Sequence, residues 1–129
     1  MTCSTKQLDE FGLVILPNAI NQELLGDLNE RIDKLFEEEA DSAGSEFKRK
    51  PGCRRLANLV NKGDVFTRVI TNETVLPHVA HVVGDFKLSS LNLRSVNPGS
   101  DVRQPLHSDT GYARVLGLQR LVDVARHHA

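Results

Sequence analysis

The segment from Leu93 to Asp109 constrains the fold of this chain more than any other. It starts as a strand-like run, passes through the turn signal of residues 97–99, and ends in an extended stretch that carries His107 and Asp109. Residues i and i+2 of a strand point to the same face, so the imidazole and the carboxylate should project side by side. Such a pair makes two thirds of the 2-His-1-carboxylate face of non-haem Fe(II) oxygenases. The segment therefore predicts a sheet that carries two metal ligands.

The longest predicted helix precedes this segment and runs from Gln22 to Ala40, with Asn21 as its N-cap. Its apolar residues recur on one stripe at helical spacing: Leu24, Leu25, Leu28, Ile32, Leu35 and Phe36. Two ion pairs at i,i+4 spacing are expected on its solvent face, Asp27–Arg31 and Glu30–Lys34. The stripe predicts a helix that packs one face on a core.

Shorter elements are expected on both sides of this helix. The sequence predicts a helix over Thr5–Phe11 with Ser4 as N-cap, a buried strand over Leu13–Leu16, a helix capped by Asp64 and ending at Ile70, a helix from Asn72 or Thr74 to Gly84, and a strand over Lys87–Val96. Helices and strands that follow one another in this way indicate an α+β fold.

Length and charge limit the possible functions. A chain of 129 residues suits one domain, and its 16 basic and 17 acidic side chains give no global attraction to nucleic acid or to a membrane surface. No apolar run is long enough to span a bilayer, so a soluble, cytoplasmic protein is expected. The two cysteines make no disulfide framework, and no His or Asp in the sequence is placed to pair with Cys53 in catalysis.

Two further groups of residues have alternative interpretations. The basic residues of 48–55 are expected to form a solvated loop, and a phosphate-binding role is the alternative. His78 and His81 lie three residues apart on a predicted helix, where they are expected to be surface or partly packed histidines. A metal site there would need a further ligand, and none is near in the sequence.

Together these residues resemble the phytanoyl-CoA dioxygenase family of Fe(II)- and 2-oxoglutarate-dependent oxygenases. The resemblance runs from about Leu8 to Tyr112. Residues 9–17 resemble the opening helix and first strand of the family, and residues 88–94 resemble a first core strand. The most specific part is Gln104–Asp109, which resembles the metal motif.

The resemblance implies a fold and a chemistry. The fold would be N-terminal helices packed on the first strands of an incomplete double-stranded β-helix, which is a jelly-roll-like barrel. His107 and Asp109 would bind Fe(II), and 2-oxoglutarate would be the cosubstrate, in contact with Gln104, Asn92 and Arg94. The implied reaction is the hydroxylation of a small molecule. The basic residues of 48–55 would attract that substrate if it were anionic.

The sequence departs from the family after residue 112. In the family, a distal metal His and a basic residue that holds 2-oxoglutarate come well after the metal motif. Here His127 and His128 follow a helix-like pattern and lack the strand that the distal ligand needs, and no basic residue matches the second position. Residues 1–112 are therefore expected to be the N-terminal portion of a dioxygenase domain, and residues 113–129 an atypical tail. A frameshift near residues 113–115 is one hypothesis for that tail. Such a truncated chain is expected to be inactive and to self-associate through unpaired strands.

Three interpretations of the sequence stay open. The first is an oxygenase of this family. The second is a non-catalytic binding module derived from the same fold, and the third is a small α+β domain of unrelated function. The first predicts 2-oxoglutarate decarboxylation by a restored full-length protein. The second predicts a stable fold with a partner and no effect of mutating His107 or Asp109, and a structure with these two residues far apart would favour the third.

Overall fold

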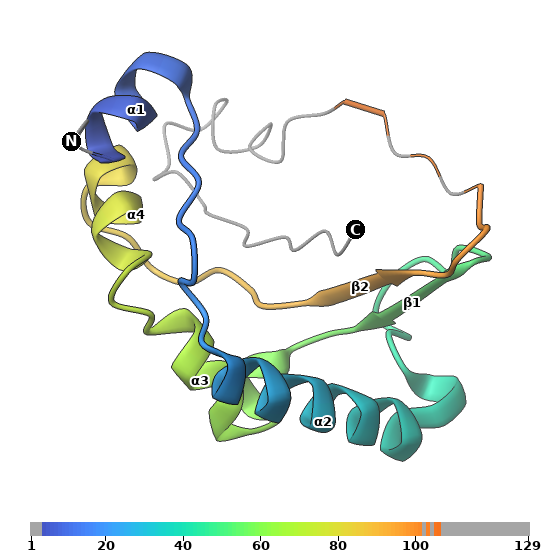
Figure 1. Ribbon diagram of the computed structural model, residues 1–129. Coiled ribbons are helices and arrows are strands. Elements are labelled where there is room, and N and C mark those ends of the chain that lie inside the picture. Colours follow the sequence, from blue (N-terminus) through green and yellow to red (C-terminus); the bar gives the residue numbers. More distant parts are fainter. Residues whose placement is uncertain (1–3, 102, 104, 107–129) are drawn as a thin grey trace.

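The computed structural model of the chain describes residues 4–101, 103, 105 and 106. Over these residues it is an α+β structure, as the sequence predicts (Figure 1). The helices and strands are α1 (Ser4–Phe11), α2 (Gln22–Glu39), β1 (Cys53–Leu56), α3 (Asp64–Ile70), α4 (Leu76–Val83) and β2 (Leu93–Val96), with short 3₁₀ turns at Ala40–Ser42 and Leu59–Asn61. No helix in this part of the chain is long and apolar enough to cross a membrane.

Helix α2 begins where its capping residue predicts. The side chain of Asn21 accepts a hydrogen bond of 2.8 Å from the backbone N–H of Leu24, which satisfies one of the unpaired donors of the first turn. The predicted stripe is also confirmed, because Leu24, Leu28 and Leu35 are buried. At its far end, Ala40 leaves the helical conformation with a positive φ of 43°.

Strands β1 and β2 form an antiparallel two-stranded sheet in which Arg55 faces Arg94 and Leu56 faces Leu93. Opposed residues of an antiparallel pair point to the same side. Leu56 and Leu93 point toward α2 and α3, where they join the hydrophobic core. In Figure 1, α2 runs along that side of the two strands.

The core lies between α2, α3 and this face of the sheet. Its buried members are Leu28 and Leu35 of α2, Leu56 of β1, Leu59, Phe66 of α3 and Leu91. Leu56 is fully buried, and Phe66 is nearly so. Residues from five separate segments therefore meet at one centre.

Polar contacts tie α2 to the segment that contains α3. Asp27 pairs with Arg68 at 2.6 Å, and the Nε of Arg31 donates to the backbone O of Lys62 at 2.7 Å. Lys62 in turn pairs with Glu39 at the end of α2. The predicted Glu30–Lys34 pair is present at 2.6 Å. These contacts fix the direction in which α2 crosses α3.

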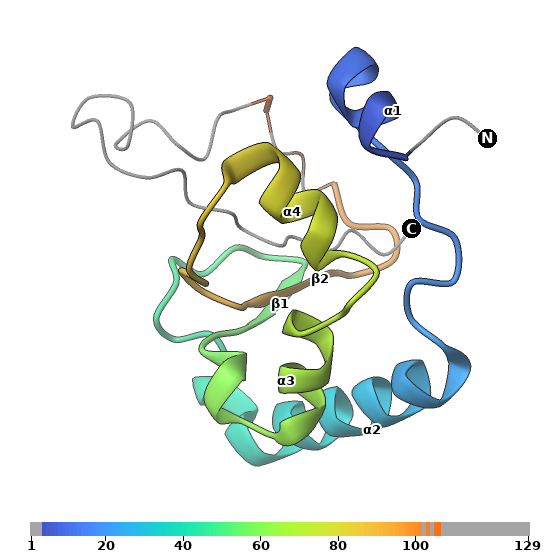
Figure 2. The same cartoon turned by 90° about the vertical axis from the view of Figure 1, so that its left-hand side faces the viewer.

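Helices α1 and α4 pack on each other at the other end of the molecule. The Nε2 of His78 lies 2.8 Å from the Oγ of Ser4, and the Nε2 of His81 lies 2.7 Å from an Oδ1 of Asp9. Both histidines therefore join α4 to α1, which agrees with the prediction of partly packed histidines. In the turned view of Figure 2, α3 lies between α2 and α4.

Several local predictions were wrong. Leu13–Leu16 is extended but is not a strand, and Leu13 and Ile15 are 62% and 80% exposed. A strand needs a partner for its backbone groups, and no described strand lies beside this run. The predicted strand over Lys87–Val96 shortens to Leu93–Val96, the four residues that pair with β1.

One predicted ion pair and one predicted N-cap also differ from the structure. Asp27 pairs with Arg68 of α3 and not with Arg31 of its own helix, because α3 brings a second guanidinium within reach. Asp64 is the first residue of α3, and Gly63 takes the N-cap position with a φ of 146°. The remaining helix boundaries agree with the sequence to within a few residues.

The core can be tested with two identical substitutions. Leu35→Ala should lower the free energy of unfolding by about 2–4 kcal/mol, because Leu35 is 2% exposed and its removal leaves a cavity. Leu13→Ala is the matched control and should change it by less than about 0.5 kcal/mol. Urea unfolding followed by circular dichroism measures both. Equal effects would contradict the position of the core.

The cap of α2 gives a second test. Asn21→Ala should cost about 1 kcal/mol, since the N–H of Leu24 loses its acceptor. Asn29→Ala on the exposed side of the same helix is the control, and it should be neutral or slightly stabilising because Ala is the better helix former. A loss in Asn29→Ala as large as that in Asn21→Ala would argue against the cap.

Candidate functional site

The predicted metal ligands lie outside the described residues. His107, Asp109 and the nearby Gln104 are therefore not placed by the structure, and their roles stay predictions. Asn92 and Arg94 are the predicted site residues that the structure does place. Arg94 lies in β2, and Asn92 directly precedes that strand.

The face of the sheet that points away from α2 and α3 carries two arginines. Arg55 of β1 and Arg94 of β2 are directly opposed in the register and share this face with Cys53 and Val96. Val96 is 47% exposed, so this end of the face is open to solvent. Like charges opposed across two strands repel each other. The face therefore attracts anions. We call it the arginine face.

The guanidinium of Arg55 is incompletely satisfied. Its Nε is buried and has no hydrogen-bond partner among the described residues. The group lies 5.0 Å from the centroid of the Phe47 ring, which covers one side of it. A buried donor without an acceptor costs free energy that a ligand oxygen can recover. Arg55 is therefore an anion-binding candidate in the described part of the chain.

Arg94 is held in place by a neighbour on the same face. Its Nε donates to the Sγ of Cys53 at 3.2 Å, and Cys53 and Arg94 are diagonal neighbours across the two strands. This contact orients the side chain along the sheet. The thiol of Cys53 thereby has a structural role as a hydrogen-bond acceptor.

Asn92 is bound into the turn that follows β1. Its Oδ1 accepts a hydrogen bond of 3.2 Å from the backbone N–H of Asn58, and its Nδ2 donates to the Oγ of Ser90 at 3.3 Å. Asn58 has a positive φ of 54°, a conformation that asparagine tolerates better than most residues. Asn92 also lines an open cavity of about 450 Å³ together with Phe47 and Asn58. Its predicted contact with cosubstrate stays a prediction, and its amide already serves the fold.

The described residues contain no group of three or more His, Cys, Asp or Glu side chains that could hold a metal ion. His78 and His81 in particular are taken up by contacts with α1 and do not meet a third ligand there.

Sequence reasoning singled out Arg94 but assigned Arg55 only to a basic loop. The missing signal was the pairing of β1 with β2, which joins residues about 40 positions apart in the chain. Once Arg55 and Arg94 are known to be opposed, alternation alone places them on the same face.

Comparison of the chain with protein-family models, with curated proteins and with solved structures found no match.

Two arginine substitutions test the arginine face. Arg55→Met should leave the free energy of unfolding unchanged or raise it by up to about 1 kcal/mol, because it removes an unsatisfied donor and the repulsion from Arg94 while it keeps apolar contact with Phe47.

Arg54→Met on the opposite face is the matched control. Its guanidinium lies 4.3 Å from the centroid of the Phe36 ring, so its loss should cost about 0.5–1 kcal/mol. Urea unfolding of both variants measures the difference. If Arg55→Met were the more damaging change, Arg55 would be a structural residue and not an anion-binding candidate.

Proposed function

We propose that this chain provides the N-terminal helices and first strands of an Fe(II)- and 2-oxoglutarate-dependent oxygenase domain of the phytanoyl-CoA dioxygenase family. The observation that carries the proposal is the placement of two arginines on one face of a sheet, in the strands that precede the His107–Asp109 motif. The full domain would be a double-stranded β-helix, with β1 and β2 among its first strands and α2 outside it.

The arginine face fits the charge of 2-oxoglutarate. That cosubstrate is a dianion with a carboxylate at each end. Guanidinium groups bind carboxylates through paired N–H donors, and the Nε of Arg55 has no hydrogen-bond partner among the described residues. Arg94, fixed by Cys53, would orient the same molecule from the neighbouring strand. Gln104 would add an amide contact, as the family resemblance implies.

His107 and Asp109 would hold the iron. Both are ligand types that suit Fe(II), and an i,i+2 spacing on an extended chain brings them together. When bound, the iron and 2-oxoglutarate would together supply the activation of O₂ needed to hydroxylate a C–H bond.

Metal titration tests the iron site. Under anaerobic conditions, His107→Ala and Asp109→Ala should each weaken Fe(II) binding by at least about tenfold, because each removes one proposed ligand of the iron. His127→Ala with His128→Ala is the matched control and should leave the affinity within about twofold. Isothermal titration calorimetry measures the three affinities.

The cosubstrate is tested in the same titrations. With Fe(II) bound, Arg55→Gln and Arg94→Gln should each weaken 2-oxoglutarate binding by about tenfold or more, the loss of one charged hydrogen bond. Lys6→Gln at a distant helix should not. Metal binding that ignored His107 and Asp109 would reject the proposal and favour a non-catalytic binding module.

A further inference from the structure

The loop between the first 3₁₀ turn (Ala40–Ser42) and β1 carries three consecutive cations, Lys48, Arg49 and Lys50, which we call the basic loop. All three side chains are exposed. They lie at the end of the molecule where β1 begins and β2 ends (Figure 1). The proposed iron and cosubstrate sites do not use them.

Both ends of the basic loop are fastened to the sheet. On one side, Phe47 donates a backbone hydrogen bond to Gly44 at 3.0 Å and its ring lies against Arg55. Gly44 itself packs so closely on β1 that an added Cβ would come within 2.7 Å of Arg55 atoms. On the other side, the carbonyl of Gly52 accepts a bond of 2.9 Å from the N–H of Asn97. The three cations therefore sit on a short segment with fixed ends.

The described carboxylates do not neutralise the charges of the basic loop. In the described part of the chain, no ion pair joins Lys48, Arg49 or Lys50 to an acidic residue. Glu38 and Glu39 at the nearby end of α2 pair instead with Arg31 and Lys62. Arg49 donates to the backbone carbonyl of Asp41 at 2.6 Å, a contact that positions its guanidinium without cancelling its charge.

We propose that the basic loop binds a small ligand through its phosphate groups. Arg and Lys side chains make their strongest hydrogen bonds to phosphate and carboxylate oxygens. Three residues span only about 10 Å, which suits a compact polyanion such as a diphosphate. An extended nucleic acid would need a longer track of cations, and the chain as a whole has a net charge of −1. Fixed ends reduce the entropy lost when the loop closes on a ligand.

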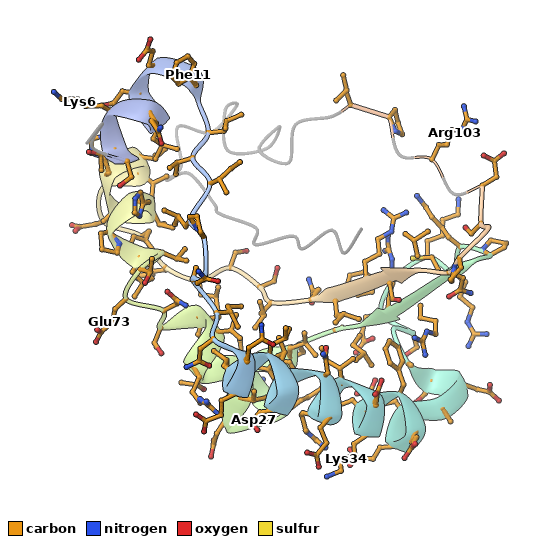
Figure 3. All side chains as sticks on the ribbon, viewed as in Figure 1. Lys6, Phe11, Asp27, Lys34, Glu73 and Arg103 are labelled. Carbon is orange, nitrogen blue, oxygen red and sulfur yellow. The ribbon has the colours of Figure 1, made fainter. Side chains whose placement is uncertain are left out.

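Calorimetric titration with inorganic pyrophosphate tests the basic loop in the metal-free full chain. The variant Lys48→Gln/Arg49→Gln/Lys50→Gln should bind it at least about tenfold more weakly than the wild type, because each charged hydrogen bond contributes more than 1.4 kcal/mol. The control variant Lys6→Gln/Lys34→Gln/Lys87→Gln loses the same charge elsewhere and should stay within about twofold. Figure 3 shows Lys6 on α1 and Lys34 on α2, both away from the start of β1.

Two further arms identify the chemistry and its source. Succinate at the same ionic strength should bind far more weakly than pyrophosphate, and equal binding would reject a phosphate site. Vesicles with and without an anionic phospholipid distinguish a lipid headgroup from a free phosphate: cosedimentation that needs both the anionic lipid and the basic loop would assign the phosphate to a headgroup. No binding of either probe, or an equal loss in the control variant, would overturn the proposal. The metal titrations use other residues, so either proposal can fail without the other.

Discussion

Burial of the apolar stripe of α2 against Leu56 and Phe66 is the interaction on which the rest of this structure depends. Leu28 and Leu35 supply the helix side of that contact, and Leu56 in β1 is fully enclosed by it. The buried area decides which face of β1 points inward. Because the side chains of a strand alternate, it also decides which face points outward. The hydrophobic contact on one side thus creates the arginine face on the other.

The arginine face and the core are two consequences of one register. Pairing Leu56 with Leu93 completes the core, and the same register opposes Arg55 to Arg94. A shift by one residue would turn Arg55 into the core, where an unpaired guanidinium is far more costly. The repulsion between the two arginines is therefore retained because the apolar pair on the opposite side outweighs it. Such an arrangement favours a bound anion, which lowers that repulsion.

The two proposed sites differ in how exposed their cations are. Arg55 and Arg94 are partly buried and held by Phe47 and Cys53, as suits an oriented small dianion. The basic loop is exposed, with its ends and the Arg49 side chain held by hydrogen bonds, as suits phosphate groups that remain partly solvated. Phe47 belongs to both regions, since it ends the fastened part of the loop and stacks on Arg55.

Local sequence determined the helices of this protein. The Asn21 cap, the stripe of α2 and the glycines that follow α1 and α4 depend on neighbours within about four residues, so they could be read directly. The α+β class followed from these elements. The His107–Asp109 pair is also a purely local motif, so the sequence alone supplies it; the pair lies outside the described residues.

The tertiary structure decided everything that needed a distant partner. Leu13–Leu16 has the composition of a strand, but it has no described strand with which to share hydrogen bonds. Asp27 had a suitable cation four residues away and pairs with Arg68, because α3 crosses α2 at that point. Arg55 became a site candidate only through its register with Arg94. Pairing across about 40 residues is set by the burial of Leu56 and Leu93, and no local pattern encodes that choice.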